Sequence, residues 1–537
     1  MAGISTAAAD LGRHLVERVC VGDILTRSAE SHGNRTALID GDRTFSFREV
    51  NAMANRLASA LLARGLQRGD VVGVMARNCA AMLIAYFGCA KAGLICAPAN
   101  LGLRPEEIAY CLKDSRAKVL FVEEALAGAA AKLPQMLPDL QAVYWIGASA
   151  PDVPKTVGTF EALLDAGSPS EVEVYVGDRD PVQLLYTSGT TAHPKGVLTS
   201  HLAVTFTALS AALANRMTHE TTSLIVLPLF HCALLNGGAV PALTIGATSV
   251  LLTGFDPIQV AAAIEKHRVR SLVLLPMMYA ALLQHPEVLG FDFSSVERAI
   301  YAMAPMPHER LKEIHELFPN ADVVLGSGQT EFTPPTTFIR PEHQWSKAGS
   351  WGSPTVMTRV GIMDDEGNLL PRGEVGELVY RGPQVMNGYL NLPEETEKSF
   401  RFGWFHSGDV AWIDEDGVVW FTDRKKDMIK TGGENVASVE VERVLMEHPG
   451  VSEAAVIGVP HEYWGEAVCA VVVPKPGVEL DENELRAFAH ERLAGFKVPK
   501  AFRIVEALPR TGTGKIQKHI LRQQLRALFT GGEGERA

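Results

Sequence analysis

The stretch Tyr186–Val197 (Y-T-S-G-T-T-A-H-P-K-G-V) places hydroxyl, glycine and lysine residues directly after an apolar run. Leu184 and Leu185 precede it and indicate the end of a buried strand. Glycines leave backbone N–H groups exposed, and the hydroxyls and the ammonium of Lys195 add further donors. The stretch therefore predicts a loop that holds a polyphosphate, although a polar surface turn would have a similar composition. The spacing does not match G-x-x-x-x-G-K-[ST], which argues against a P-loop NTPase.

Length and composition predict a large buried core and argue against a general nucleic-acid-binding protein. The chain has 537 residues, is 47% hydrophobic and carries a net charge of −12. This length is enough for about two to four domains, and the negative charge argues against general nucleic-acid binding. The seven cysteines contain no C-x-x-C pair, which is typical of a reducing compartment, so a cytoplasmic location is expected.

Two long apolar stretches, Ala80–Ala99 and Thr221–Phe255, resemble membrane spans at first sight. Glycines interrupt both, and Pro228 and Pro241 interrupt the second. We therefore expect buried core elements and no membrane span. The first residues lack the apolar core of a signal peptide, so none is expected.

The rest of the chain alternates helical and strand patterns, which predicts an α/β fold with a mainly parallel sheet. Residues 123–180 are richer in Ala, Pro and Gly and are interpreted as a variable surface region. The expected helices cover residues 47–64, 439–446 and 485–493, and the expected strands cover 71–75, 119–122, 454–459 and 467–473.

The opening stretch resembles the signature loop of the adenylate-forming (ANL) superfamily, which contains acyl- and aryl-CoA synthetases, peptide-synthetase adenylation domains and luciferases. The usual form is Y-T-S-G-T-T-G-x-P-K-G-V, and this chain departs from it only at Ala192. The resemblance runs in order from about Phe45 to Lys515. It implies a large N-terminal domain of βα-layered sheets (1–422), a hinge (423–426) and a smaller α+β C-terminal domain (427–537) that swings.

The resemblance also implies which residues bind ATP and support adenylation. Catalytic roles fall to Lys515, Lys195, Glu331 and Thr187, and Glu331 would hold Mg²⁺. The family places an aromatic residue on the adenine where this chain has Ser327. The ATP- or AMP-binding set is Thr187, Ser188, Gly189, Thr190, Thr191, Lys195, Ala304, Pro305, Ser327, Gly328, Gln329, Thr330, Asp409, Arg424 and Lys515.

Two further sets follow from the same resemblance. The block Pro228-Leu-Phe-His231 would border the acyl pocket, and Met303 is bulkier than the usual small residue. This predicts a short-to-medium acid or a single-ring aromatic acid. The acyl-pocket set is His231, Cys232, Leu234, Leu235, Asn236, Met303 and Gly326. The thioester-forming face is Lys430, Gly432 and Gly433, and the hinge residue is Lys426.

The acceptor of the acyl group separates the remaining hypotheses. Residues 497–526 carry eight Lys or Arg and one acid, a balance that suits the phosphates of CoA and favours a CoA ligase. The alternative is an adenylating ligase that passes the acyl group to an amine or a carrier-protein thiol. A non-catalytic nucleotide sensor is disfavoured because Lys515, Lys195 and Glu331 are all present. A carboxylic acid, ATP, Mg²⁺ and CoA are the expected ligands, and the resemblance is compatible with a homodimer.

Overall fold

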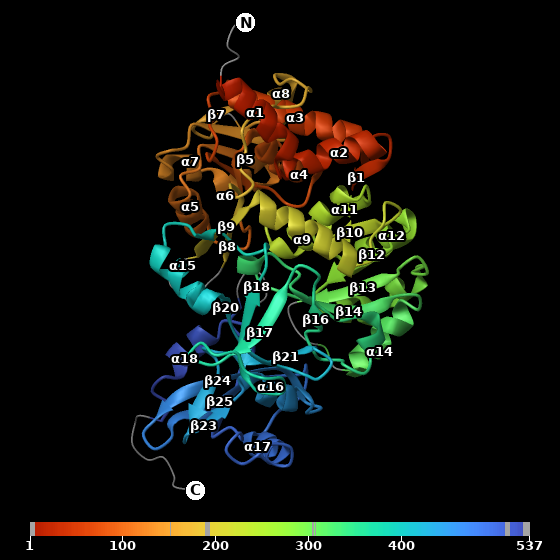
Figure 1. Ribbon diagram of the computed structural model, residues 1–537. Helices are drawn as coiled ribbons and strands as arrows, with labels where there is room; N and C mark the ends of the chain where they lie inside the picture. Colours follow the sequence, from red (N-terminus) through yellow and green to blue (C-terminus); the bar gives the residue numbers. More distant parts are fainter. Residues whose placement is uncertain are drawn as a thin grey trace, which may run out of the picture. The chain divides into compact units, whose positions relative to one another are not determined.

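The computed structural model describes residues 6–150, 152–187, 194–302, 306, 308–510 and 516–529. The predicted site residues outside these ranges are Ser188, Gly189, Thr190, Thr191, Met303, Ala304, Pro305 and Lys515. Two compact units are present (Figure 1). The first is Met1–Val360 with Tyr380–Phe405 and Gly417–Val419, and the second is Gly361–Val379 with His406–Asp416 and Trp420–Ala537. The hinge at 423–426 stays a prediction.

The first unit contains an eight-stranded sheet that carries the opening stretch. Its order is β19-β9-β8-β4-β3-β5-β6-β7, parallel from β8 to β7, with β9 antiparallel to both β8 and β19. The strands are β3 (Val71–Met75), β4 (Ile95–Pro98), β5 (Val119–Glu123), β6 (Ala142–Ile146), β7 (Thr156–Thr159), β8 (Pro181–Thr187), β9 (Lys195–Ser200) and β19 (Gly388–Tyr389). Every residue of β3 is buried, as parallel strands covered on both faces require.

The interpretation of residues 123–180 as a surface region was wrong in part. β6 and β7 extend the eight-stranded sheet, and Trp145 on β6 is fully buried. This segment is rich in alanine and glycine, which give only a weak hydrophobic pattern in the sequence. Small residues are nevertheless common in a core, because they fill tight spaces between sheet and helix. The short helix α8 (Phe160–Asp165) buries Phe160 in a different hydrophobic cluster from Trp145, one that also contains Phe121 of β5.

A nine-stranded sheet forms the other half of the first unit. Its order is β16-β15-β14-β13-β12-β10-β11-β1-β2, with parallel pairs from β14 to β1. The strands are β1 (Thr36–Asp40), β2 (Arg43–Ser46), β10 (Thr222–Ile225), β11 (Thr248–Leu251), β12 (Ser271–Leu274), β13 (Arg298–Ala302), β14 (Asp322–Ser327), β15 (Thr337–Phe338) and β16 (Ser353–Pro354).

Helices packed between these two sheets form the main core. α4 (Ala80–Ala92) is buried at every position, and its cluster includes Phe121 from one sheet and Ile225 from the other. α3 (Phe47–Ala63) starts at a capping box in which Ser46 and Glu49 bond reciprocally. The other long helices of this unit are α1 (Thr6–Glu17), α2 (Gly22–His32), α5 (Pro105–Asp114), α9 (His201–Ala214), α12 (Pro257–His267), α13 (Pro276–Gln284) and α14 (His308–Leu317).

The full burial of α4 confirms that Ala80–Ala99 is a core element. This explains why the helix shows no polar stripe, since neither face meets water. Within the part of the chain that the structure describes, none of the helices has both the length and the apolar character needed to cross a membrane.

The second unit is an α+β arrangement built on two smaller sheets. Most residues of β17 (Arg359–Met363), β18 (Gly376–Arg381), β20 (Phe405–Ile413) and β21 (Val419–Arg424) belong to it. The other sheet contains β22 (Ile429–Thr431), β23 (Glu434–Val436), β24 (Val451–His461), β25 (Gly465–Pro474) and β26 (Ala501–Ile504). Its helices are α16 (Ser438–Met446), α17 (Glu482–His490) and α18 (Lys518–Leu525).

Strands β24 and β25, labelled in Figure 1, are buried on both faces. Alternate residues of the two strands belong to two different hydrophobic clusters. Val456 and Val468 pack with α16 and α17, whereas Ile457 and Cys469 pack with Leu521 of α18. The period of two explains this division, because successive side chains of a strand point to opposite faces. The expected helices and strands of this region are therefore confirmed, and so is the predicted α/β fold class.

Candidate functional site

The β8–β9 hairpin fixes both ends of the predicted phosphate loop. Thr187 and Lys195 are paired across the hairpin, and the Thr187 hydroxyl donates to the Lys195 carbonyl at 3.4 Å. The Tyr186 hydroxyl donates to Asp114 Oδ2 at 2.8 Å, which anchors β8 to α5. The residues at the two ends of the predicted loop are therefore held next to each other.

Lys195 is held by two groups from one distant segment. Its Nζ lies 2.8 Å from Glu395 Oε2, on α15 (Pro393–Ser399), and 5.2 Å from the centroid of the Tyr389 ring. The hydrogen bond from Lys195 lowers the pKa of Glu395. The ammonium therefore has a carboxylate and an aromatic face as partners, and is positioned at the end of the loop.

Glu331 lies on the short 3-10 helix η4 (Thr330–Phe332) and meets the same tyrosine. The Tyr389 hydroxyl donates to Glu331 Oε1 at 3.0 Å, and the Met386 backbone N–H donates to the Glu331 carbonyl at 2.9 Å. Burial and the nearby Glu331 charge raise the pKa of Tyr389. The tyrosine is thus a neutral hydrogen-bond donor at physiological pH. Lys195 and Glu331 are 136 residues apart in the sequence (331 − 195). In the structure, both of them contact Tyr389.

The predicted acyl segment touches the Glu331 segment at one point. Cys232 Sγ lies 3.2 Å from the Thr330 hydroxyl. His231 is half-buried beside Cys232, at the amino end of α10 (Cys232–Leu234). This contact connects the block that would border the acyl chain with the block that would contact phosphate.

The remaining residues of the predicted acyl set differ in their surroundings. Leu234 and Leu235 are buried in the core that contains α4. Asn236 is fully buried and exchanges two hydrogen bonds of 3.0 Å with Gln183 of β8. Gly326 lies on β14, where an added Cβ would meet Phe338 at 3.1 Å. Their roles at a pocket stay predictions.

Ser327 ends β14 and has no aromatic face to offer a base. Its carbonyl accepts a hydrogen bond from the Thr336 N–H at 2.8 Å, so the backbone is fixed while the side chain is half-buried. Gly328, Gln329 and Thr330 follow it directly and lead into η4. The segment predicted to meet adenine is therefore anchored directly before Glu331 in the chain.

Replacing Ser327 with tyrosine is expected to strengthen ATP binding. A stacked aromatic contributes roughly 0.5–1.5 kcal/mol beyond area burial, so Ser327→Tyr should lower the KM for ATP by up to about tenfold. Steady-state kinetics at saturating acid measure this, with Ser327→Thr as the matched control. An unchanged or higher KM would show that another group already covers that face of the base.

In the second unit, the two residues predicted at the ribose lie together. Asp409 on β20 is 6% exposed, and its Oδ1 lies 3.5 Å from Arg424 Nε on β21. Asp423 is buried and accepts hydrogen bonds from the backbone N–H groups of Arg424 and Ser438 at 2.7 and 2.5 Å. The Asp409 carboxylate has two acceptor oxygens, which suits the predicted contact with a ribose diol.

Lys425, inside the predicted hinge, is bonded to Glu377 on β18 and to Asp365. Lys425 Nζ lies 3.0 Å from Glu377 Oε2 and 2.6 Å from Asp365 Oδ1. Burial alone would raise the pKa of Glu377, but hydrogen bonds from Lys425 and His406 lower it. Lys426, the predicted hinge residue, is exposed in the turn that follows β21.

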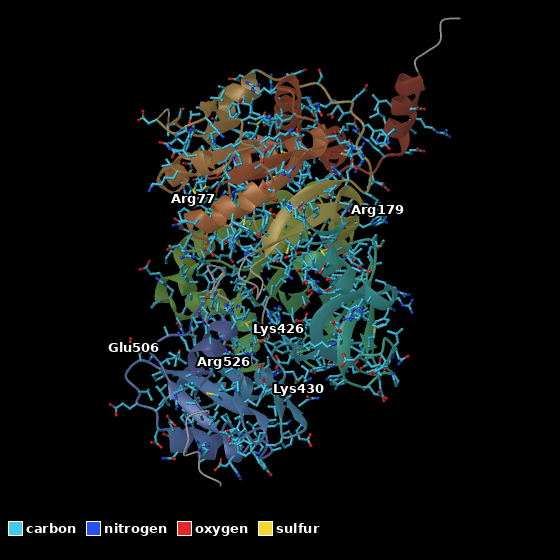
Figure 2. The ribbon with its side chains drawn as sticks, turned by 90° about the vertical axis from the view of Figure 1, so that its left-hand side faces the viewer. Arg77, Arg179, Lys426, Lys430, Glu506 and Arg526 are labelled. Atoms are coloured by element: carbon cyan, nitrogen blue, oxygen red, sulfur yellow. The ribbon has the colours of Figure 1, made fainter. Side chains whose placement is uncertain are left out.

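The predicted thioester-forming face is a tight hairpin in the second unit. Thr431 pairs with Glu434, which leaves Gly432 and Gly433 as a two-residue turn with φ of 60° and 89°. Such positive angles at both positions favour glycine strongly. Figure 2 labels Lys426 in the turn before this hairpin and Lys430 on β22, where its side chain is exposed.

Most described cations of residues 497–526 are paired within the second unit. The predicted surplus of positive charge is therefore largely offset by acids that lie elsewhere in the sequence. The pairs are Lys497–Glu440, Arg503–Glu482, Arg510–Glu453, Lys518–Glu442 and Arg522–Asp427. The stretch is a set of structural ion pairs more than an open basic patch.

Two residues at the Lys195 and Glu331 group were not predicted to take part in it. Neither Tyr389 nor Glu395 is among the site residues that the sequence predicted. The hydrogen-bonded pair Lys195–Glu395 is separated by 200 residues. In the sequence, the Gly388-Tyr389 pair gives no indication that Tyr389 meets Glu331 and Lys195. These contacts form only when the chain folds.

Comparison with known proteins identifies the family of this chain. Residues 25–390 match the family model described as AMP-binding enzyme, and residues 440–515 match its C-terminal domain. The feruloyl-CoA synthase of Amycolatopsis sp is 37% identical, with 94% of this chain and 99% of that protein aligned. The long-chain fatty-acid–CoA ligase FadD13 of Mycobacterium tuberculosis is 36% identical, with 90% and 94% aligned.

Two solved structures are similar over nearly the whole chain. The anthranilate CoA ligase AuaEII in complex with anthranoyl-AMP has a TM-score of 0.87 and 28% identity, covering 96% of this chain and 99% of that one. The amide bond synthetase McbA of Marinactinospora thermotolerans has a TM-score of 0.84 and 29% identity, covering 94% and 99%.

Proposed function

This chain belongs to the family of AMP-binding enzymes and is an AMP-forming acid–thiol ligase, and from that premise we propose that it activates an aromatic or short-to-medium carboxylic acid with ATP and transfers the acyl group to CoA. The observation that carries the proposal is the group formed by Lys195 and Glu331 at the β8–β9 hairpin, joined through Tyr389. A cation and a carboxylate held together at the end of a hydroxyl- and glycine-rich loop suit a metal-bound polyphosphate.

The chemistry explains why such a site is needed. A carboxylate is a poor electrophile, because attack on its carbonyl would have to expel oxide. Attack of the carboxylate oxygen on the α-phosphorus of ATP instead releases pyrophosphate and leaves an acyl-adenylate, from which AMP departs readily when the CoA thiol attacks. Negative charge builds on the α-phosphate in the first step. Lys195 and Lys515 would offset it through preorganised positive charge.

Magnesium fits the residues that are present. Among the described residues, no cluster of three or more His, Cys, Asp or Glu side chains could hold a metal ion by itself. Glu331 would therefore supply one carboxylate ligand and the phosphates of ATP most of the others, which is how Mg²⁺ commonly binds at nucleotide sites. When bound, the ion would neutralise phosphate charge. Tyr389 occupies Glu331 Oε1, and a carboxylate has further lone pairs to offer.

A single experiment can identify which class of carboxylic acid this enzyme activates. Relatives named for ferulate and the structural neighbour named for anthranilate support an aromatic acid, whereas FadD13 is named for long-chain fatty acids. Pyrophosphate release should be measured with ferulate, indoleacetate, anthranilate, hexanoate and palmitate. Turnover with a single-ring acid, with AMP and acyl-CoA formed in equal amounts, is the expected result. Turnover with palmitate alone would contradict it.

An amine acceptor is the second candidate, because McbA is named as an amide bond synthetase. Both reactions share the adenylate and differ only in the nucleophile that attacks it. AMP release should be compared with CoA and with a panel of amines under the best acid. AMP release that depends on an amine and is unaffected by CoA would favour the amide-forming reaction.

Enlarging the acyl pocket at Met303 is expected to broaden the range of acids. Met303 stands in the sequence where the family has a small residue, so Met303→Gly should make room for more of the acyl chain. This should raise kcat/KM for a C12 or C16 acid by at least about tenfold, since each further substrate methylene that is buried contributes about 0.8 kcal/mol. Met303→Leu, which keeps the volume, is the matched control. Equal discrimination by both variants would place the size limit elsewhere.

A further inference from the structure

Tyr389 touches two charged groups that come from separate parts of the first unit. Its hydroxyl donates to Glu331 Oε1 at 3.0 Å, and its ring centroid lies 5.2 Å from Lys195 Nζ. Both of these groups face phosphate in the proposed function, on which this inference rests. A single side chain therefore connects the metal-side carboxylate with the loop lysine.

The backbone around Tyr389 is fixed to the strand that carries Lys195. Tyr389 pairs with Val197 of β9, and the neighbouring Leu390 N–H donates to the Gly196 carbonyl at 2.8 Å. The Tyr389 N–H donates to the Thr396 hydroxyl at 2.9 Å, which anchors the start of α15 as well. The tyrosine is consequently attached to the hairpin end, and its hydroxyl is held at a defined place relative to Lys195.

The chemistry of the phenol suits a positioning role. A phenol that meets a carboxylate donates its hydroxyl hydrogen, and the Tyr389 hydroxyl does so to Glu331 Oε1 at 3.0 Å. It occupies one oxygen of Glu331 and restricts the rotation of the carboxylate, which leaves the other oxygen for a cation. Its ring offers a face to the ammonium, which Glu395 holds from another side at 2.8 Å.

We propose that Tyr389 is a positioning residue that aligns the Glu331 carboxylate with Lys195, so that Mg²⁺ and ATP bind cooperatively. With Tyr389 in place, the carboxylate is already oriented when the metal-bound nucleotide arrives. Without the hydroxyl, Glu331 must be ordered at the moment of binding, and the metal contributes less to ATP affinity. The effect is therefore on the coupling between metal and nucleotide, and not on nucleotide affinity as such.

The test is equilibrium binding of ATP, measured by calorimetry with excess Mg²⁺ and again with a chelator. The ratio of the two dissociation constants reports the coupling. Tyr389→Phe keeps the ring and loses the hydroxyl, and should reduce this ratio by about tenfold, since hydrogen bonds to charged groups are among the stronger ones. Tyr389→Leu, measured alongside, should reduce the ratio similarly and also weaken metal-free binding through the lost aromatic face.

Three controls separate positioning from general damage. Tyr144→Phe removes a hydroxyl that accepts a 2.7 Å hydrogen bond from Arg64 in the same unit, and should leave the ratio unchanged. Glu395→Gln removes the charge of the carboxylate that holds Lys195 and leaves Glu331 unchanged. It should therefore change the dissociation constants of ATP with Mg²⁺ and with the chelator by the same factor, which preserves the ratio. In a Glu331→Gln background, Tyr389→Phe should have no further effect on the ratio.

An unchanged ratio in both Tyr389 variants would overturn the inference, whatever their catalytic rates. An equal fall in Tyr144→Phe would overturn it as well, because the effect would then not depend on the contact with Glu331. Failure of the proposed function is a separate outcome. If no acid or acceptor gives pyrophosphate or AMP, the binding ratio still decides the role of Tyr389.

Discussion

Lys515→Ala is expected to abolish pyrophosphate release while the enzyme still converts supplied acyl-adenylate and CoA to acyl-CoA. The lysine belongs to the glycine-flanked block Pro509–Lys518 that matches the family pattern. Its charge is needed where charge develops on the α-phosphate, and removal of one preorganised charged donor costs on the order of 10²–10³ in rate. Single-turnover assays of each half-reaction measure the two steps separately.

The partner variant Lys430→Ala should show the opposite bias. Lys430 is exposed on β22 beside the Gly432-Gly433 turn, at the proposed thioester-forming face. Near-normal adenylate formation with slowed thioester formation is expected, because the proposed rotation of residues 427–537 about 423–426 would bring this face into use only for the second step. Lys475→Ala, at an exposed lysine of the same unit, should change neither half-reaction.

Equal impairment of both half-reactions by both variants would rule out this rotation. The C-terminal region would then have to act as one fixed surface in both steps. A bias in the predicted direction for Lys515→Ala alone would support its role in adenylation and remove Lys430 from the proposal.

The second large effect concerns stability and the buried ammonium of Lys91. The Lys91 side chain is 3% exposed, and its Nζ lies 2.7 Å from Glu171 Oε2 and 2.7 Å from the Thr26 hydroxyl. Glu171 also accepts hydrogen bonds from Asn51 and Asn55. The carboxylate therefore attaches the segment before β8 to three helices, α2, α3 and α4, of the main core.

Glu171→Ala is expected to lower the free energy of unfolding of the first unit by about 2–3 kcal/mol. Removing one partner of a buried pair costs about 3–5 kcal/mol, and the exposure of the Glu171 side chain, 44%, reduces this because water can approach. Urea unfolding monitored by tryptophan fluorescence measures the change. Glu173→Ala, exposed in the same segment, is the control and should cost less than about 0.5 kcal/mol.

The same pair gives stability a defined dependence on pH. Burial alone would raise the pKa of Glu171, but hydrogen bonds from Lys91, Asn55 and Asn51 and the Lys91 charge lower it to about 2. A carboxyl whose pKa is lower in the folded state stabilises the fold above its ordinary pKa, and this contribution is lost as the pH falls toward 2. The difference between wild type and Glu171→Ala should be constant near pH 7 and shrink below about pH 4.5. A difference that grew on acidification would contradict the pairing.

The sequence by itself determined the family, the fold class and most element positions of this protein. Local patterns were sufficient for these, because the period of apolar residues reflects which face of an element meets the core. The apolar run at 80–99 became the buried α4 and β4, and the alternating valines near 454–473 became β24 and β25. The predicted roles of the loop residues and of Glu331 came from the resemblance to the family, whose motifs are short and continuous in the sequence.

Only the tertiary structure decided which charged groups meet. Tyr389 and Glu331 are 58 residues apart, and Lys195 and Glu395 are 200 apart, so no local pattern relates them. For residues 497–526, the sequence suggested a surplus of positive charge. The count of cations left out the acids of the second unit that pair with them. Electrostatic interactions depend on distance through space and on burial, and both of these exist only after the chain has folded.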